Sequence, residues 1–134
     1  VGLVMVKKSL PRNFLTMLSL VHLRTFFLHS FKIDFQCGSC PSPDVAFHFN
    51  PRFEEGGCVV CNTFESQNWG REERKYEMPF LKGHPFEIRV LVKHDSFQVI
   101  VNAVFYLQIH YKMAILLNQG TFSHLKSYIK TIPF

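Results

Sequence analysis

Hydrophobic and polar residues alternate in several short stretches of this chain. The clearest are FKIDFQ (31–36), DVAFHFN (44–50), FEIRVLV (86–92) and FQVIVN (97–102). In each of them every second residue is apolar, which is the period of a β-strand with one buried face. Gly and Pro residues punctuate the chain between them. Several short strands at this spacing predict an all-β fold, either a sandwich or a barrel.

Two other stretches fit a helix and a strand about equally well. Residues 1–30 contain LTMLSLVHL, and residues 103–119 read AVFYLQIHYKMAILLNQ. Both are predicted as strands, because the neighbouring segments are strands. The final segment, HLKSYIKTIPF, also alternates and is predicted as the last strand.

Composition is that of one globular domain over residues 1–134. Hydrophobic residues make up 47% and charged residues 19%, which excludes a disordered chain. The net charge is +5, but no run of five basic residues occurs, so no nucleic-acid partner is expected. No apolar run reaches the length of a membrane span, and His22, Arg24 and His29 interrupt the most hydrophobic segment. Neither membrane insertion nor a signal peptide is therefore expected.

The four cysteines form two C-x₂-C pairs, CGSC at 37–40 and CVVC at 58–61, with the spacing of a zinc ribbon. A zinc site needs both thiolates of a pair at one point. Val59 and Val60 favour an extended chain, in which Cys58 and Cys61 point to opposite faces. The expectation is therefore no metal and no cofactor. A zinc-binding module, a catalytic dithiol at CGSC and a disulfide remain alternatives.

Polar side chains suited to a polyhydroxylated ligand follow the same alternation. His48, Asn50 and Arg52 share one face of a predicted strand, opposite Val45, Phe47 and Phe49. The candidate set continues along the chain with Asn62, Trp69, Glu72 and Arg74. Guanidinium groups donate, a carboxylate accepts, an amide does both, and an indole covers C–H groups. Each residue alone is more typical of an ordinary surface or core position, and the pattern does not name the ligand.

A resemblance does name one. The pieces DVAFHFNPRF, VVCNT and WGREER, followed by MPF, KG and PFEI, resemble the carbohydrate-recognition domain of the galectins. VNA at 101–103 is similar to that family's VNG. The resemblance is best over residues 31–102 and is most similar to the tandem-repeat members. It implies a two-sheet antiparallel β-sandwich of jelly-roll type. It also implies binding of β-galactosides such as lactose and N-acetyllactosamine, without metal or catalysis.

The resemblance also implies a role for each candidate. The axial 4-hydroxyl of galactose would be bound by His48, Asn50 and Arg52. The 6-hydroxyl would be bound by Asn62 and Glu72, and Trp69 would stack on the apolar face of the ring. The neighbouring glucose or N-acetylglucosamine would be reached by Arg52, Glu72 and Arg74. The expected partners are glycans and glycoproteins that carry β-galactosides, with a homodimer or a partner domain in a longer chain as further expectations.

The chain departs from the family pattern outside the site. Residues 1–30 and 103–134 diverge, and the hairpin VNG becomes Asn102–Ala103. A type I′ turn needs a positive φ at both central residues, which is unfavourable for Ala. These changes lie on scaffold strands. They leave open a galectin-like interaction or structural protein that has lost sugar binding. An enzyme is not expected, because the sequence shows no recognisable pair of a nucleophile and a base. The expected location is the cytoplasm, with export that needs no signal peptide.

Overall fold

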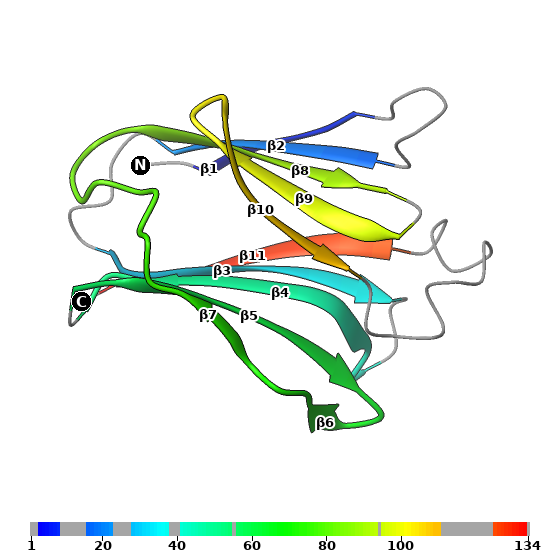
Figure 1. Cartoon of the computed structure of the whole chain (residues 1–134). Helices are drawn as coiled ribbons and strands as arrows, with labels where there is room; N and C mark the ends of the chain where they lie inside the picture. Colours follow the sequence, from blue (N-terminus) through cyan, green and yellow to red (C-terminus); the bar gives the residue numbers. More distant parts are fainter. Residues whose placement is uncertain are drawn as a thin grey trace. The chain divides into compact units, whose positions relative to one another are not determined.

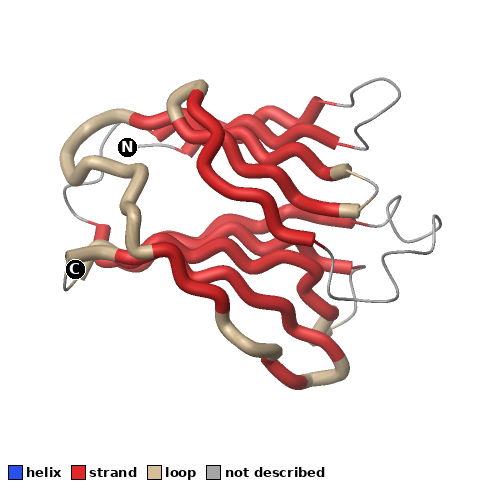
Figure 2. The backbone as a smooth tube through the Cα atoms, in the orientation of Figure 1, coloured by secondary structure: helices blue, strands red, loops and turns tan. Residues whose placement is uncertain are grey.

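The described part of the protein consists of strands and connecting turns. The structure is a computed structural model that describes residues 3–8, 16–22, 28–37, 41–54, 56–93, 95–110 and 125–133. No residue in these ranges belongs to a helix, as Figure 2 shows. The strands form two antiparallel sheets, which confirms the all-β prediction.

The first sheet has five strands in the order β1-β2-β8-β9-β10 (Figure 1). These strands are β1 (Leu3–Lys8), β2 (Thr16–His22), β8 (Phe86–Val92), β9 (Ser96–Val101) and β10 (Val104–His110). Every neighbouring pair is antiparallel. The buried side chains alternate as the sequence predicts, with Ile88, Val90 and Val92 fully enclosed and Arg89 exposed between them.

The second sheet carries the candidate residues. Its order is β11-β3-β4-β5-β6, with β7 paired to β5. The strands are β3 (Leu28–Cys37), β4 (Asp44–Arg52), β5 (Cys58–Glu65), β6 (Asn68–Trp69), β7 (Glu73–Lys75) and β11 (Leu125–Pro133). The predicted apolar face is confirmed, since Phe31, Ile33, Phe47 and Phe49 are at most 1% exposed. The sequence pattern did not predict the short strands β6 and β7.

The ambiguous stretches are strands wherever the structure describes them. In residues 1–30 these are β1, β2 and the start of β3, and in residues 103–119 it is β10. The last predicted strand is β11, which pairs with β3 from Leu125↔Cys37 onward. Residues 9–15, 23–27 and 111–124 lie outside the described ranges.

The β9–β10 hairpin has the backbone that its sequence predicts. Asn102 and Ala103 have φ values of 50° and 64°. Asn102 is also tied to β8: its N–H donates to the Glu87 carbonyl at 2.8 Å, and its Oδ1 accepts from the Glu87 N–H at 2.9 Å. Asn tolerates the left-handed region, whereas Ala at such a φ is strained.

Replacing Ala103 by glycine should raise the free energy of unfolding by about 1 kcal/mol, because glycine adopts a positive φ without a Cβ clash. Urea denaturation with an unchanged m-value would measure the gain. Ala46→Gly in β4 is the control, since it only adds backbone freedom to a strand and should destabilise the protein. An Ala103→Gly variant no more stable than the wild type would contradict the strain argument.

Candidate functional site

The register of the second sheet brings the polar residues of four strands onto one face. Across β3, β4 and β5, Asp34 lies opposite His48 and His48 opposite Asn62. The next row joins Asn50 to Val60 and Val60 to Arg74 of β7. Because alternate residues of a strand share a face, these rows place the HFNPR and WGREER motifs side by side.

His48 is more enclosed than the half-buried strand predicted from the sequence. The residue is only 9% exposed, because β4 is flanked on both sides by other strands. Its Nδ1 lies 2.5 Å from Oδ1 of Asp34. The indole of Trp69 approaches the ring edge-on, with centroids 4.9 Å apart. The imidazole is therefore held from two directions.

Asn50 positions Arg52 from within the same strand. Its Nδ2 donates to the carbonyl of Phe31 at 2.7 Å, and its Oδ1 accepts from Nε of Arg52 at 2.9 Å. With Nε engaged, the Nη groups of Arg52 remain for a ligand or for Glu72. The buried amide thus fixes the plane of a half-buried guanidinium group.

Glu72 links the two arginines. Its Oε2 accepts from Nη2 of Arg74 at 2.8 Å and from Nε at 3.0 Å, and its Oε1 lies 3.9 Å from Nη2 of Arg52. The hydrogen bonds from Arg74 hold the pKa of Glu72 below its usual value, so the carboxylate is ionised at neutral pH. An ionised carboxylate accepts hydrogen bonds only, which suits it to bind hydroxyl donors.

Asn62 is locked against the segment after β6. Its Nδ2 donates to the carbonyl of Gly70 at 3.0 Å, and its Oδ1 accepts from the N–H of Thr63 at 2.8 Å. A Cβ on residue 70 would lie 3.2 Å from that Oδ1, which is tighter than usual contact. The glycine therefore lets the WG segment close onto Asn62.

Trp69 follows a turn whose conformation is held by hydrogen bonds to residues Ser42 and Asp44. Ser66 and Gln67 have φ values of 52° and 66°, which neither residue favours. Gln67 exchanges hydrogen bonds with Ser42 at 2.9 and 3.0 Å, and the N–H of Ser66 donates to Asp44 at 2.9 Å. We call these three hydrogen bonds the 42–67 clasp. The clasp fixes the turn that places Trp69, which is 51% exposed, beside Phe64.

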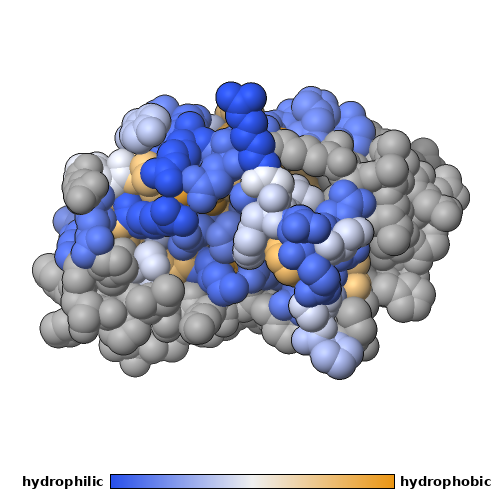
Figure 3. All heavy atoms as spheres, turned by 90° about the horizontal axis from the view of Figure 1, so that it is seen from below, coloured by the Kyte–Doolittle hydropathy of each residue, from blue (hydrophilic) through white to orange (hydrophobic). Residues whose placement is uncertain are grey.

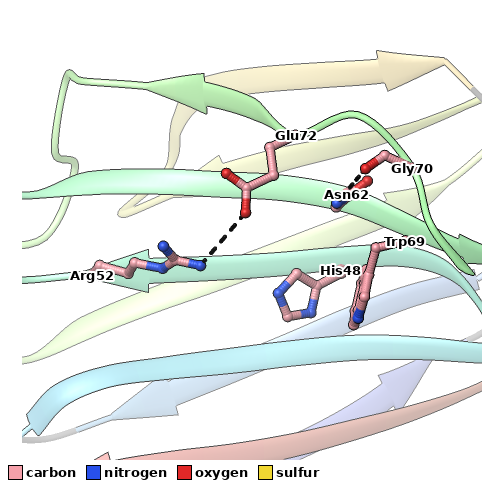
Figure 4. A pocket seen from close by; sticks show the side chains of 6 residues that line it. All are labelled: His48, Arg52, Asn62, Trp69, Gly70 and Glu72. Carbon is pink, nitrogen blue, oxygen red and sulfur yellow. Dashed lines mark hydrogen bonds and ion pairs between the residues drawn. The ribbon is translucent and has the colours of Figure 1, made fainter.

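These residues surround a pocket of about 330 Å³. Its lining residues are His48, Arg52, Asn62, Trp69, Gly70 and Glu72 (Figure 4). Five of the seven candidates thus line one pocket. The other two are Asn50, which lies behind Arg52, and Arg74, which lies beside Glu72. In Figure 3, hydrophilic residues cover most of the visible described surface, and hydrophobic ones form small separate patches.

Sequence reasoning missed Gly70 and Asp34. Gly70 lies in the WGREER motif, but only the contact with Asn62 shows why a residue without a side chain is needed there. For Asp34, the alternation in FKIDFQ already places Lys32 and Asp34 opposite Phe31, Ile33 and Phe35. A charged residue on that face, in a strand next to HFNPR, is the sequence feature that could have indicated Asp34 as a site residue.

Cys58 and Cys61 do not converge on one point. Cys58 and Cys61 lie three residues apart in the extended strand β5, as predicted, and therefore on opposite faces. Burial raises the pKa of Cys37 to about 11, so its thiol is protonated at neutral pH and is a weak nucleophile. Cys40 lies outside the described residues. Within those residues, no group of three or more His, Cys, Asp and Glu is placed to hold a metal ion. No helix there is long and apolar enough to cross a membrane.

Comparison with known proteins finds galectins. The chain is 53% identical over 72 residues to galectin-3 of Cricetulus longicaudatus, covering 52% of this chain and 29% of that protein. It is 50% identical over 74 residues to galectin-8 of Rattus norvegicus, covering 54% and 23%. With galectin-3 of Canis lupus familiaris it shares 43% over 105 residues, covering 77% and 33%. The aligned part spans about a third or less of the length of these relatives.

A structural comparison shows the fold. Sheep galectin-11, solved as a complex with glycerol, superposes with a TM-score of 0.73 at 23% sequence identity. The match covers 98% of this chain and 91% of that one. The predicted galectin-like fold is therefore confirmed.

A family model settles the membership. The model described as galactoside-binding lectin matches residues 6–125, which is most of the chain. The match extends on both sides of residues 31–102, where the sequence motifs lie. The chain belongs to the galactoside-binding lectin family, the galectins.

Proposed function

We propose that this chain binds β-galactosides of the lactose and N-acetyllactosamine type in the pocket between β4, β5 and the segment after β6. The observation that carries the proposal is the convergence of imidazole, guanidinium, amide, carboxylate and indole groups around one space of about 330 Å³. A sugar offers hydroxyls that donate and accept, together with a patch of C–H groups. The pocket offers a partner for each.

Galactose is the sugar that the proposal places against β4. His48 and Arg52, with Asn50 behind them, hydrogen-bond its axial 4-hydroxyl. An epimer with an equatorial 4-hydroxyl leaves these groups unpaired, at a cost of about 1–3 kcal/mol for each buried group. The proposed selectivity for galactose over glucose therefore comes from the enclosed imidazole and the guanidinium group that Asn50 holds.

The remaining contacts complete the disaccharide. Asn62 and Glu72 bind the 6-hydroxyl, and the exposed indole of Trp69 covers the C–H face of the galactose ring. The second sugar lies over the pair formed by Glu72 and Arg74, with Arg52 within reach. The hydrogen bonds among these side chains support this role, because they hold the groups in place before a ligand arrives.

Affinity for a single disaccharide should be modest. At roughly 0.3 kcal/mol per heavy atom, the dissociation constant for lactose is on the order of 10 μM. The partners of this activity are glycans and glycoproteins with exposed β-galactosides. Tight attachment to them needs several sites at once, which a homodimer or a second domain would provide.

Lactose should produce a saturable change in the fluorescence of Trp69, the only tryptophan of the chain. The signal reports on this one site, because no other indole contributes. Cellobiose differs from lactose only in the configuration of the 4-hydroxyl of its non-reducing sugar and should give no change, and sucrose is a second control. A folded protein that ignores lactose would contradict the proposal and favour a galectin-like interaction protein without sugar binding.

A further inference from the structure

A line of three charged or titratable side chains leads from β3 into the pocket. Nζ of Lys32 donates to Oδ2 of Asp34 at 2.7 Å, and Oδ1 of Asp34 meets Nδ1 of His48 at 2.5 Å. Asp34 is only 4% exposed, whereas Lys32 reaches solvent. Each oxygen of this buried carboxylate thus has its own partner. The proposed sugar contacts make no use of Asp34 or Lys32.

The carboxylate of Asp34 is ionised. Burial by itself would raise the pKa of Asp34, but the hydrogen bonds from His48 and Lys32 and the charges of these two groups together outweigh it and leave the pKa below its usual value. An ionised carboxylate has no hydrogen to donate. The hydrogen between Asp34 and His48 therefore belongs to Nδ1, and Nε2 is the ring nitrogen left for a ligand.

We propose that Asp34 is a positioning residue of the sugar site, which holds His48 as the Nδ1–H tautomer and presents Nε2 to the ligand as a hydrogen-bond acceptor. The inference rests on the proposed galactoside binding. Free imidazole side chains favour the opposite tautomer, with the hydrogen on Nε2. The protein must therefore impose the Nδ1–H form, and Asp34 is the group in contact that can do so.

This tautomer matches the needs of one hydroxyl. A hydroxyl donates one hydrogen bond and accepts up to two. The axial 4-hydroxyl can donate to Nε2 of His48 while it accepts from a guanidinium N–H of Arg52. With the hydrogen on Nε2 instead, His48 and Arg52 would both donate, and the hydroxyl hydrogen would have no acceptor on either residue.

None of the other groups described below takes the place of Asp34 as the partner of Nδ1 of His48. Opposite it on β5 lies the uncharged Asn62, and the indole of Trp69 approaches the ring edge-on. The charges on the pocket side are those of Arg52 on β4 and of Glu72 in the segment after β6. Arg52 donates to Asn50, Glu72 accepts from Arg74, and Arg52 and Glu72 lie 3.9 Å apart.

Asp34→Asn provides the test. An amide has only one acceptor oxygen, for which the two donors Lys32 and His48 must compete. The ammonium group of Lys32 should take that oxygen and turn the amide NH₂ toward His48, which forces the hydrogen to Nε2. Lactose affinity should then fall about tenfold, the cost of one unmade hydrogen bond. In Lys32→Met/Asp34→Asn the oxygen is released to His48, so the Nδ1–H tautomer and most of the affinity should return. Lys32→Met alone should stay within about twofold of the wild type.

The tautomer is read from the ¹⁵N shifts of the His48 ring, identified by their loss in His48→Gln. Asp95→Asn, just before β9 and outside both the pocket lining and the 42–67 clasp, controls for the loss of a carboxylate. Two results overturn the proposal: Nε2–H in the wild type, which needs no variant to fold, or Asp34→Asn with unchanged tautomer and affinity. A wild type with the Nδ1–H tautomer that ignores lactose would refute the proposed function but uphold the Asp34–His48 contact.

Discussion

Replacing Glu72 by glutamine should weaken lactose binding by about a hundredfold, the scale of one to two lost charge-assisted hydrogen bonds. The side chain keeps its shape but loses its charge and one of its two acceptor oxygens. In the protein those oxygens face Arg74 and Arg52. A glutamine NH₂ in their place would meet a guanidinium donor. The variant therefore leaves one uncharged acceptor oxygen where Arg74, Arg52 and a sugar hydroxyl shared two charged ones.

Isothermal titration calorimetry of wild type and Glu72→Gln would measure the effect. Glu73→Gln is the matched control, because Glu73 pairs with Cys61 in the register of β7 and so faces away from the Val60–Arg74 row. It should bind lactose as the wild type does. If Glu72→Gln and Glu73→Gln bound equally well, Glu72 would not contact the sugar.

Replacing Trp69 by alanine should weaken lactose binding about thirtyfold. This loss lies within the range found when an aromatic residue that dominates a binding site is replaced by alanine. The indole is half exposed and lines the pocket, so one of its faces is available to a ligand. Covering that face with the C–H groups of galactose removes apolar surface from water on both partners. Trp69→Phe should recover part of the affinity, because it keeps a smaller aromatic face.

Trp69→Ala has no tryptophan fluorescence, so its binding must be measured by calorimetry or by retention on lactose–agarose. Tyr76→Ala removes another exposed aromatic residue, one that does not line the pocket, and should bind normally. Circular dichroism should show both variants folded. Normal lactose affinity in folded Trp69→Ala would show that the indole does not stack on the sugar.

The strands that carry the site were predictable because their sequences contain strong local signals. In 44–50 the alternation places Phe47 and Phe49 inside and His48 and Asn50 on the other face, and the register of β4 shows this arrangement. The motifs HFNPR and WGREER indicated the family, and the family match confirms it together with the prediction that the chain is not an enzyme. The positive φ values at Asn102 and Ala103 agree with the type I′ turn expected from the resemblance to the family's VNG hairpin.

Other features depend on contacts between distant residues, which alternation does not report. Asp34 lies fourteen positions before His48, and only the β3–β4 register brings the two together. Strands β6 and β7 have two and three residues, too few for a pattern to emerge. The register between β3 and β4 shifts near Ala46, an irregularity that the even alternation of DVAFHFN gave no reason to expect.

The 42–67 clasp should give the indole of Trp69 an opening equilibrium of its own. The clasp consists of three hydrogen bonds between exposed side chains and turn atoms, outside the ladders of the longer strands. It closes a turn whose backbone would relax if it were released, since Ser66 and Gln67 both have positive φ. Local opening of such a segment requires less free energy than global unfolding. On mild heating, sugar binding should therefore be lost before the sheets unfold. The unfolding temperature from calorimetry would then overstate the temperature up to which the protein binds sugar.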